Sequence, residues 1–187
     1  MNYLIVGLGN IGYEYENTRH NIGFDVADAL AKDLKVNFEL KRLAHYTKTK
    51  FKGRKVVIIK PPAYMNLSGK ALRYWMQMEK VPQENVLVLV DDKDLPLAKL
   101  RLRHKGSDAG HNGLKDVALQ LGNTNYNRLK FGIGNDFKPG QQVNFVLGKW
   151  TTEEKDVLPK AIANSVDIIK SFVASGVQRT MNQYNKK

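Results

Sequence analysis

The chain has 187 residues, a length that fits one domain, and 42% of them are hydrophobic, enough for a packed core and too many for a disordered chain. It has no cysteine, which excludes a disulfide scaffold, a cysteine nucleophile and a cysteine-ligated metal centre. Lysine and arginine total 30 against 18 aspartates and glutamates, and the net charge of +12 favours a polyanionic partner.

Strands and helices are predicted to alternate along the chain. The first apolar run, residues 3–8, predicts a buried strand and is too short for a signal or membrane segment, so we expect a soluble, cytoplasmic protein. Further strands are predicted at 55–59, 86–90, 97–104, 128–133 and 143–147. Helices are predicted at 21–34, from Asn66 as N-cap through Met76, at 114–121 and at 152–174.

The order of these elements indicates the fold class. Strands and helices intermix without a convincing linker or repeat, so residues 1–187 are predicted to form one α/β domain. Its central sheet is expected to be mixed, mostly parallel and twisted, with flanking helices. The polar tail after Thr180 is expected to fray.

The turn after the first strand matches the dinucleotide-binding pattern G-x-G-x-x-G at Gly7, Gly9 and Gly12. A dehydrogenase would use this turn and could take Glu39 as its ribose acid. However, an acidic and aromatic segment, 13–17, follows where a diphosphate would lie, and helical periodicity resumes only near residue 21. We therefore favour a tight turn that presents Asn10 over a cofactor site.

Positive charge is concentrated in two segments. Between Glu39 and Glu79 there is no acidic residue, and much of that excess fits a solvated surface. In the run LAKLRLRHK, the cations would share one face of a strand: Lys99, Arg101, Arg103 and Lys105. A solvated outer face is one interpretation; binding of phosphates is the other, and we rank it slightly higher because like charges repel without an anion.

Several polar residues follow strand ends or glycine turns, where ligand sites gather in α/β sheets: Asn10, Asn66, Asp91, His111 and Asn112. His20 lies at the start of the first helix. A histidine with a carboxylate can activate water, and asparagine amides can stabilise an oxyanion. Taken singly, Asn10 and Asn66 are better explained as turn and cap residues; Asp91 could be a cap, His20 a helix residue and His111 a residue packed in its loop. Their convergence favours a site. The four scattered histidines predict no metal, and no cofactor is expected.

The segments that carry these residues resemble bacterial peptidyl-tRNA hydrolase over nearly the whole chain. The matching segments are VGLGNIGYEYENTRHNIGF (6–24), KPPAYMNLSGKAL (60–72), VDDKDLPLAKLRLRHKGSDAGHNGLKD (90–116), RLKFGIG (128–134) and FVLGKW (145–150). The resemblance implies an ester hydrolase that releases a peptide from the 3′-terminal ribose of tRNA. It implies a partner contacted at the acceptor arm and 3′ end, no membrane, and a monomer.

The resemblance also implies roles for single residues. His20 would be the catalytic base and Asp91 its partner, while the substrate and the reacting carbonyl would be held by Asn10, Asn66 and Asn112. The other implied substrate contacts are Tyr15 on the tRNA side, Tyr64 and Met65 in the peptide channel, and His111 as a supporting residue. Arg103 and, less securely, Lys130 would bind the 5′-phosphate of tRNA.

This chain departs from the family pattern at a few positions, none of them a proposed catalytic residue. Ile11 replaces a proline in the first turn, which would loosen it. Lys93 stands where an apolar residue is common, and Asp108 and Ala109 replace small residues, so the loop electrostatics near the phosphate contacts would change. A non-catalytic RNA-binding module stays open as a second rival, but it would leave the pairing of His20 with Asp91 without purpose.

Overall fold

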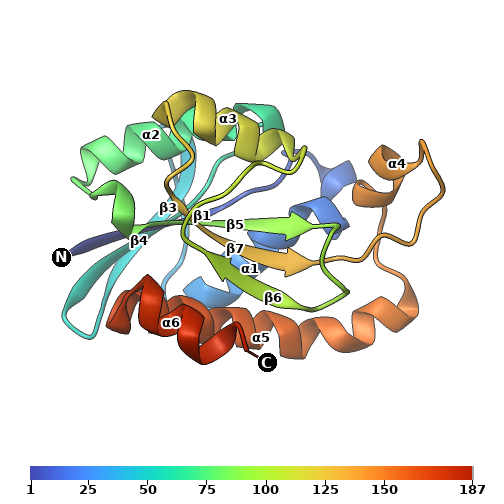
Figure 1. The fold of residues 1–187 in the computed structure, drawn as a ribbon. Coiled ribbons are helices and arrows are strands. Elements are labelled where there is room, and N and C mark those ends of the chain that lie inside the picture. The colour runs from blue at the N-terminus through green and yellow to red at the C-terminus, as the bar shows by residue number, and fades with distance from the viewer. Residues whose placement is uncertain (187) are drawn as a thin grey trace.

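A seven-stranded sheet forms the centre of the molecule (Figure 1). The computed structural model describes residues 1–186. The strands are β1 (Asn2–Gly7), β2 (Glu39–Lys41), β3 (Ala44–Phe51), β4 (Arg54–Lys60), β5 (Val86–Asp92), β6 (Leu100–Arg103) and β7 (Asn127–Gly132), in the order β2-β3-β4-β1-β5-β7-β6. The four central strands are parallel, and β2, β3 and β6 pair antiparallel at the edges. The predicted mixed α/β sheet is confirmed.

Helices cover both faces of this sheet (Figure 1). One face carries α1 (Ile22–Asp33), α5 (Thr152–Ser175) and α6 (Val177–Tyr184); the other carries α2 (Ser68–Met78) and α3 (Asn112–Leu121). The central strands are therefore buried on both sides: Ile5 packs in one core and Leu4 in the other, each fully buried. This double burial explains the unbroken apolar runs from which these strands were predicted.

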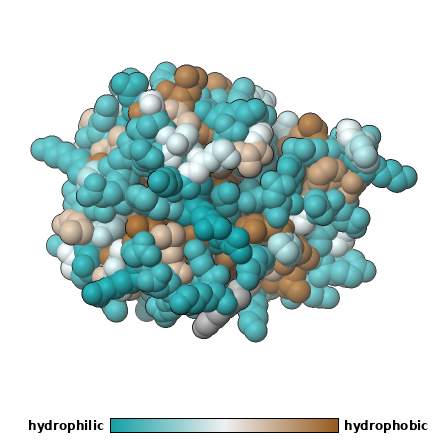
Figure 2. All heavy atoms as spheres, viewed as in Figure 1, coloured by the Kyte–Doolittle hydropathy of each residue, from teal (hydrophilic) through white to brown (hydrophobic). Residues whose placement is uncertain are grey.

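The short helix α4 (Gln142–Val146) lies beyond the carboxyl ends of β5 and β7 (Figure 1). The prediction of a strand at 143–147 is wrong. Val143, Val146 and Leu147 recur at helical spacing, and the backbone N–H of Leu147 donates to the carbonyl of Val143. In the same view most of the surface is hydrophilic, and apolar side chains gather in patches, one of them toward the α4 end (Figure 2).

Three other boundaries differ from the predictions. The basic strand spans only Leu100–Arg103, because Ala98 takes a positive φ of 65° before it and the chain bends after it. Asn66 is not an N-cap: α2 starts at Ser68, after a 3₁₀ turn. The last helix continues past Thr180: α6 ends at Tyr184, and the Asn185 side chain hydrogen-bonds both backbone groups of Leu102. Residue 187 of the C-terminal tail lies outside the described residues.

The glycine turn serves close packing between β1 and α1. A Cβ atom at Gly7 would lie 2.5 Å from the Gly23 carbonyl oxygen, and one at Gly9 would meet the Phe24 ring at 2.6 Å. The helix begins at Ile22, ten residues after the motif ends at Gly12. Two 3₁₀ turns, Tyr13–Tyr15 and Arg19–Asn21, lie between the motif and α1, so this helix does not start within the motif as it does in a dinucleotide-binding fold.

Candidate active site

A pocket of about 400 Å³ opens at the carboxyl ends of the parallel strands. Residues from several segments between Asn10 and Leu147 line it: Asn10, His20, Met65, Asn66, Val90, Asp91, Asp92, Lys93, Asp94, Asp108, Ala109, Gly110, His111, Asn112, Leu114, Lys130, Gln142, Val143, Val146 and Leu147. Most of the predicted site residues therefore meet in one cavity. Parallel strands bring this about because their carboxyl ends share one edge of the sheet.

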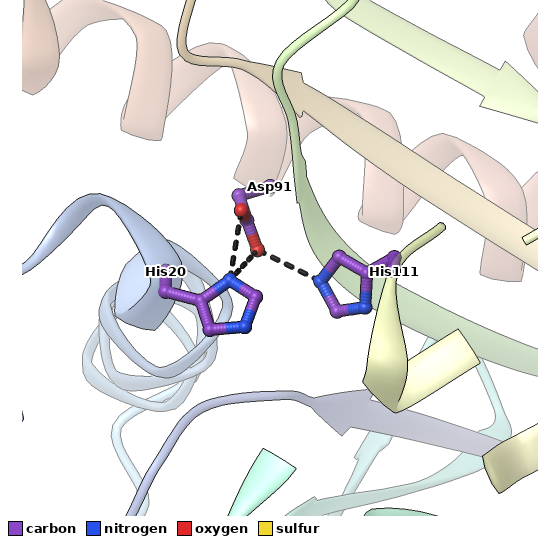
Figure 3. A group of neighbouring side chains, drawn as sticks. All are labelled: His20, Asp91 and His111. Atoms are coloured by element: carbon purple, nitrogen blue, oxygen red, sulfur yellow. Dashed lines mark hydrogen bonds and ion pairs between the residues drawn. The ribbon is translucent and has the colours of Figure 1, made fainter. Parts of the chain in front are cut away.

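The imidazole of His20 is held by Asp91 (Figure 3). A 3₁₀ turn, Arg19–Asn21, presents His20 to the end of β5, and its Nδ1 lies 2.9 Å from both carboxylate oxygens of Asp91. Because an ionised carboxylate only accepts, Nδ1 carries the proton and donates it. The opposite nitrogen, Nε2, keeps its lone pair and makes no hydrogen bond within residues 1–186.

His111 contacts the same carboxylate from the other side (Figure 3). Its Nε2 lies 2.9 Å from Oδ1 of Asp91, and its Nδ1 accepts hydrogen bonds from the backbone N–H groups of Gly113 and Leu114 at the start of α3. Those donors fix the tautomer, so Nε2–H donates to Asp91. Both nitrogens of His111 are committed, and of the two histidines only His20 can accept a proton from a ligand.

Asp91 is buried, with 5% of its surface exposed. Burial alone would raise its pKa, but the charges and hydrogen bonds of His111 and His20 outweigh burial and hold the pKa of this carboxyl well below its usual range. The carboxylate therefore stays ionised at neutral pH and orients both imidazoles.

The ligand atoms of His20, Asp91 and His111 all lie within 4.8 Å of one another, a cluster that could be considered for a metal ion. The geometry fits hydrogen bonding better. Each imidazole nitrogen that faces Asp91 is at hydrogen-bond distance, 2.9 Å, from a carboxylate oxygen. A metal ion at this place would have to displace both N–H···O contacts.

Asn10 is fixed by both its backbone and its side chain. Its backbone N–H donates to Oδ1 of Asn21 at 2.8 Å, and its carbonyl accepts from Nδ2 of Asn21 at 3.0 Å. Its own Oδ1 accepts from the Met65 backbone N–H at 2.6 Å. The Nδ2 donor of Asn10 makes no hydrogen bond within the described 186 residues and belongs to the pocket lining. The sequence analysis missed Asn21, although it follows His20 directly.

Asn66 and Asn112 both line the pocket with exposed side chains. Asn66 lies in the 3₁₀ turn Met65–Leu67, and Asn112 is the first residue of α3. Neither side-chain amide hydrogen-bonds to any other described residue. Because α2 is capped instead by Asp116 of α3, whose Oδ2 accepts from the Gly69 N–H at 2.6 Å, the Asn66 amide remains available to a ligand.

The three residues that the resemblance implies as peptide and tRNA contacts do not all lie in the pocket. Met65 is buried and lines the pocket. Tyr15 and Tyr64 lie outside the lining and contact each other edge to face, with ring centroids 6.3 Å apart. Tyr64 is 53% exposed. The two tyrosines therefore form an accessible aromatic pair on one outer surface.

The two cations of the predicted phosphate clamp are not opposite each other. Lys130 lines the pocket, lies 3.5 Å from the Asp92 carboxylate and pairs in register with Arg101. Arg103 is exposed outside the lining and pairs with Arg128. Both side chains share the sheet face that carries α3, because Leu102 and Leu129 occupy the other face.

Three of the positions where the chain departs from the family pattern line the pocket: Lys93, Asp108 and Ala109. Ile11 lies outside this lining. Lys93 forms an ion pair with Asp94 at 2.9 Å, and both line the cavity. Asp108 lines it too, and its Oδ1 accepts from the Gly110 N–H within the loop. Each added charge therefore has a partner in the protein.

Arg128, predicted only as the start of a strand, organises the loop before α3. Its guanidinium is fully buried and donates to four backbone carbonyls: those of Gly106, Ser107, Thr124 and Tyr126. It also stacks on the Tyr126 ring, 4.0 Å from the centroid. No local pattern signals this role, because the acceptors are backbone groups.

Comparison with known proteins shows the family of this chain. The family model described as Peptidyl-tRNA hydrolase matches residues 4–187. The chain belongs to the peptidyl-tRNA hydrolase family. It is 57% identical over 187 residues to the Phocaeicola vulgatus protein and 55% identical over 185 residues to that of Porphyromonas gingivalis; the alignments cover 100% and 99% of this chain and 100% of each relative.

The family's fold matches as well. The crystal structure of peptidyl-tRNA hydrolase from Acinetobacter baumannii superimposes with a TM-score of 0.92 at 32% identity, covering 98% of this chain and 94% of the other. Family membership makes this chain a hydrolase of the ester bond in peptidyl-tRNA. Among the described residues, none of the helices is long and apolar enough to cross a membrane.

Proposed function

We propose that this pocket hydrolyses the ester between a peptide and the 3′-terminal ribose of tRNA by water that His20 activates. The observation that supports this proposal is how the two nitrogens of His20 differ. Nδ1 hydrogen-bonds Asp91 at 2.9 Å, whereas Nε2 makes no hydrogen bond to any described residue. We further propose that the protein acts as a monomer in the cytoplasm and contacts the acceptor arm and 3′ end.

The reaction needs no covalent enzyme intermediate. Nε2 of His20 removes a proton from water as the water oxygen bonds to the ester carbonyl carbon. Asp91 stabilises the imidazolium through Nδ1–H. When the tetrahedral intermediate collapses, the bond to the ribose 3′-oxygen breaks, and the imidazolium returns the proton to that oxygen. His111 supports Asp91 and takes no proton itself.

The asparagine amides supply neutral donors where negative charge develops. Asn10 is immobilised through Asn21, and its Nδ2 positions water or the substrate carbonyl. Asn66 and Asn112 hold the peptide backbone and donate to the oxyanion. Met65 contacts the acyl group, while Tyr64 and Tyr15 contact the peptide and the tRNA end from the pocket rim.

Phosphates of the tRNA would be bound by Lys130 and Arg103. The net charge of +12 favours approach of a polyanion in general. The pairing of Lys130 with Asp92 means that a phosphate must compete with a carboxylate for this ammonium. Arg103 is exposed, so we expect it to contribute a screened contact outside the cavity.

The experiment is to incubate the protein with an N-blocked aminoacyl-tRNA and, separately, with free aminoacyl-tRNA. Selective release of the blocked amino acid supports the hydrolase. Absence of release with retained tRNA binding would leave only a binding module and overturn the proposal. Nicotinamide binding in a thermal-shift assay would instead favour the dehydrogenase, which the packing of Gly7 and Gly9 against α1 argues against.

A further inference from the structure

The α4 wall of the pocket is too small to hold itself in place. Helix α4 has 5 residues, and none of them is buried. An isolated helix of this length is unstable in water. Yet Val143 and Val146, with Leu147 after it, form the apolar wall of the cavity that contains His20. Contacts from elsewhere in the chain must fix this wall.

Arg19, the residue before His20, supplies three such contacts. Its Nη1 donates to the Phe145 carbonyl at 2.9 Å, and its guanidinium lies over the Phe145 ring, 4.2 Å from the centroid. Its backbone N–H donates to the Gly148 carbonyl at 3.1 Å. One residue therefore joins the turn that carries the base to the helix that closes the pocket.

The other edge of the guanidinium is fixed to α5. Nε and Nη2 of Arg19 donate to the two carboxylate oxygens of Glu154 at 3.0 and 2.6 Å. Glu154 lies in the first turn of α5, where its backbone N–H is capped by Thr151 Oγ1 at 3.2 Å. Arg19 is 7% exposed, so this two-pronged pair is shielded from solvent.

Gly148 shows how closely the guanidinium approaches the α4 segment. A Cβ atom at this position would lie 2.7 Å from Nη1 of Arg19. Even an alanine would displace the guanidinium from the Phe145 carbonyl. Electrostatics agree with the geometry: burial would raise the pKa of Glu154, but the hydrogen bonds and charge of Arg19 outweigh it and lower this pKa, so the pair is charged at neutral pH.

We propose that Arg19 is a positioning residue for the hydrolysis: through Glu154 and Phe145 it holds the α4 wall at a fixed place beside His20 and thereby sets how tightly the acyl part of the substrate binds. This inference rests on the proposed function for its kinetic consequence. Arg19 does not line the pocket, and its effect on chemistry is transmitted through α4.

The kinetic test compares Arg19→Lys, Glu154→Gln and the double variant on an N-blocked aminoacyl-tRNA. Lysine keeps the charge but cannot bind both carboxylate oxygens of Glu154 and the Phe145 carbonyl at the same time, so KM should rise about tenfold. kcat should stay within about twofold, with an unchanged pH midpoint. The double variant should be no worse than Arg19→Lys alone, because the contact with Glu154 is already lost in that variant. Lys170→Gln breaks a solvent-exposed pair of the same helix with Asp33 and should leave KM unchanged.

Hydrogen exchange gives a readout that does not need activity. Backbone amides of residues 142–149 should exchange about tenfold faster in Arg19→Lys, while those of α1 keep their wild-type rates. If Arg19→Lys does not fold, Gly148→Ala tests the same contact. Unchanged KM together with unchanged exchange would overturn the inference, and so would equal loss of protection in α1. A wild-type protein that hydrolyses nothing would refute the proposed function, while the exchange data would still decide the role of Arg19.

Discussion

The two ends of the parallel strands use the same residue type in opposite ways. At the amino end, asparagine amides are consumed by the protein: Asn127 donates to two backbone carbonyls, Asn85 to that of Asn2, and Asn2 to that of Glu79. At the carboxyl end, Asn66 and Asn112 have no partner among the described residues. Satisfied buried amides stabilise the fold, whereas amides left open in a pocket can bind a ligand.

The carboxylates of the two ends show the same contrast. Near the amino end, Glu79 accepts from the Tyr46 hydroxyl and from Lys55 Nζ. At the carboxyl end, Asp91 accepts from two imidazoles, one of which has a second nitrogen open to the pocket. Glu79 therefore stabilises the fold, whereas the negative charge of Asp91 acts on an imidazole that can accept a proton.

Asp91→Asn should cause the largest effect at the carboxyl end. An asparagine amide can donate to Nδ1 of His20 and so place the proton on Nε2, which removes the base. We expect kcat to fall roughly 10²–10⁴-fold. Asp92→Asn is the matched control, because Asp92 pairs with Lys130 and does not contact His20, and it should lose far less. Equal losses in the two variants would contradict the assignment.

Asn127→Ala should have the reverse consequence at the amino end. It leaves the buried carbonyls of Glu84 and Val86 without their donor, so the free energy of unfolding should fall by about 2 kcal/mol. kcat should not change, because the residue is remote from the pocket lining. Urea denaturation measures the free energy of unfolding, and Asn182→Ala, at an exposed residue, serves as the control. A stable variant with impaired kcat would break the contrast between the two ends.

Asp25 in α1 differs from both Glu79 and Asp91, because it is a carboxyl group without a hydrogen-bond donor among the described residues. Burial, and then repulsion from Asp28, raise its pKa to about 7 despite the nearby Lys60. The neutral form is favoured in the folded state, so its stabilising effect is complete below about pH 4 and is lost as pH rises toward 7.

Asp25→Asn should therefore raise the free energy of unfolding by about 1–2 kcal/mol at pH 8, with a smaller gain at pH 4. Thermal unfolding at several pH values measures this difference. A gain that is the same at both pH values would show that ionisation of Asp25 is not its cause.

Arg103→Gln should give the smallest effect. Losing one phosphate contact should weaken tRNA binding a few-fold and lower the slope of log affinity against log salt by about 1. Arg179→Gln on α6, which is exposed and remote from the pocket, should leave the slope unchanged. An unchanged slope in Arg103→Gln would remove this residue from the phosphate contacts.

The central strands could be predicted because burial on both faces produces continuous apolar runs, as in β5. The edge hairpin of β2 and β3 was missed, since β2 is exposed, β3 is only partly buried, and both carry polar residues that include lysines. Helix α4 was mistaken for a strand because its few apolar residues fit both periods. Short elements without a buried face are decided by tertiary contacts, which local sequence does not contain.

Within the site, the residue types that meet at the sheet edge could be predicted, but their partners could not. The resemblance implied His20 and Asp91, while the second imidazole on Asp91 and the clamp of Asn21 on Asn10 depend on three-dimensional placement. The offset between Arg103 and Lys130 follows from strand register. Arg19 was missed because its partner Glu154 lies 135 positions away in the sequence.

The most direct test of the account is the turnover of His20→Ala on an N-blocked aminoacyl-tRNA, measured together with its affinity for tRNA. We expect kcat of His20→Ala to fall roughly 10²–10⁴-fold, while the Kd for tRNA changes less than about threefold. His45→Ala, which replaces a histidine outside the pocket lining, should keep wild-type kcat. Near-normal turnover by His20→Ala would contradict the claim that Nε2 of this imidazole activates the water.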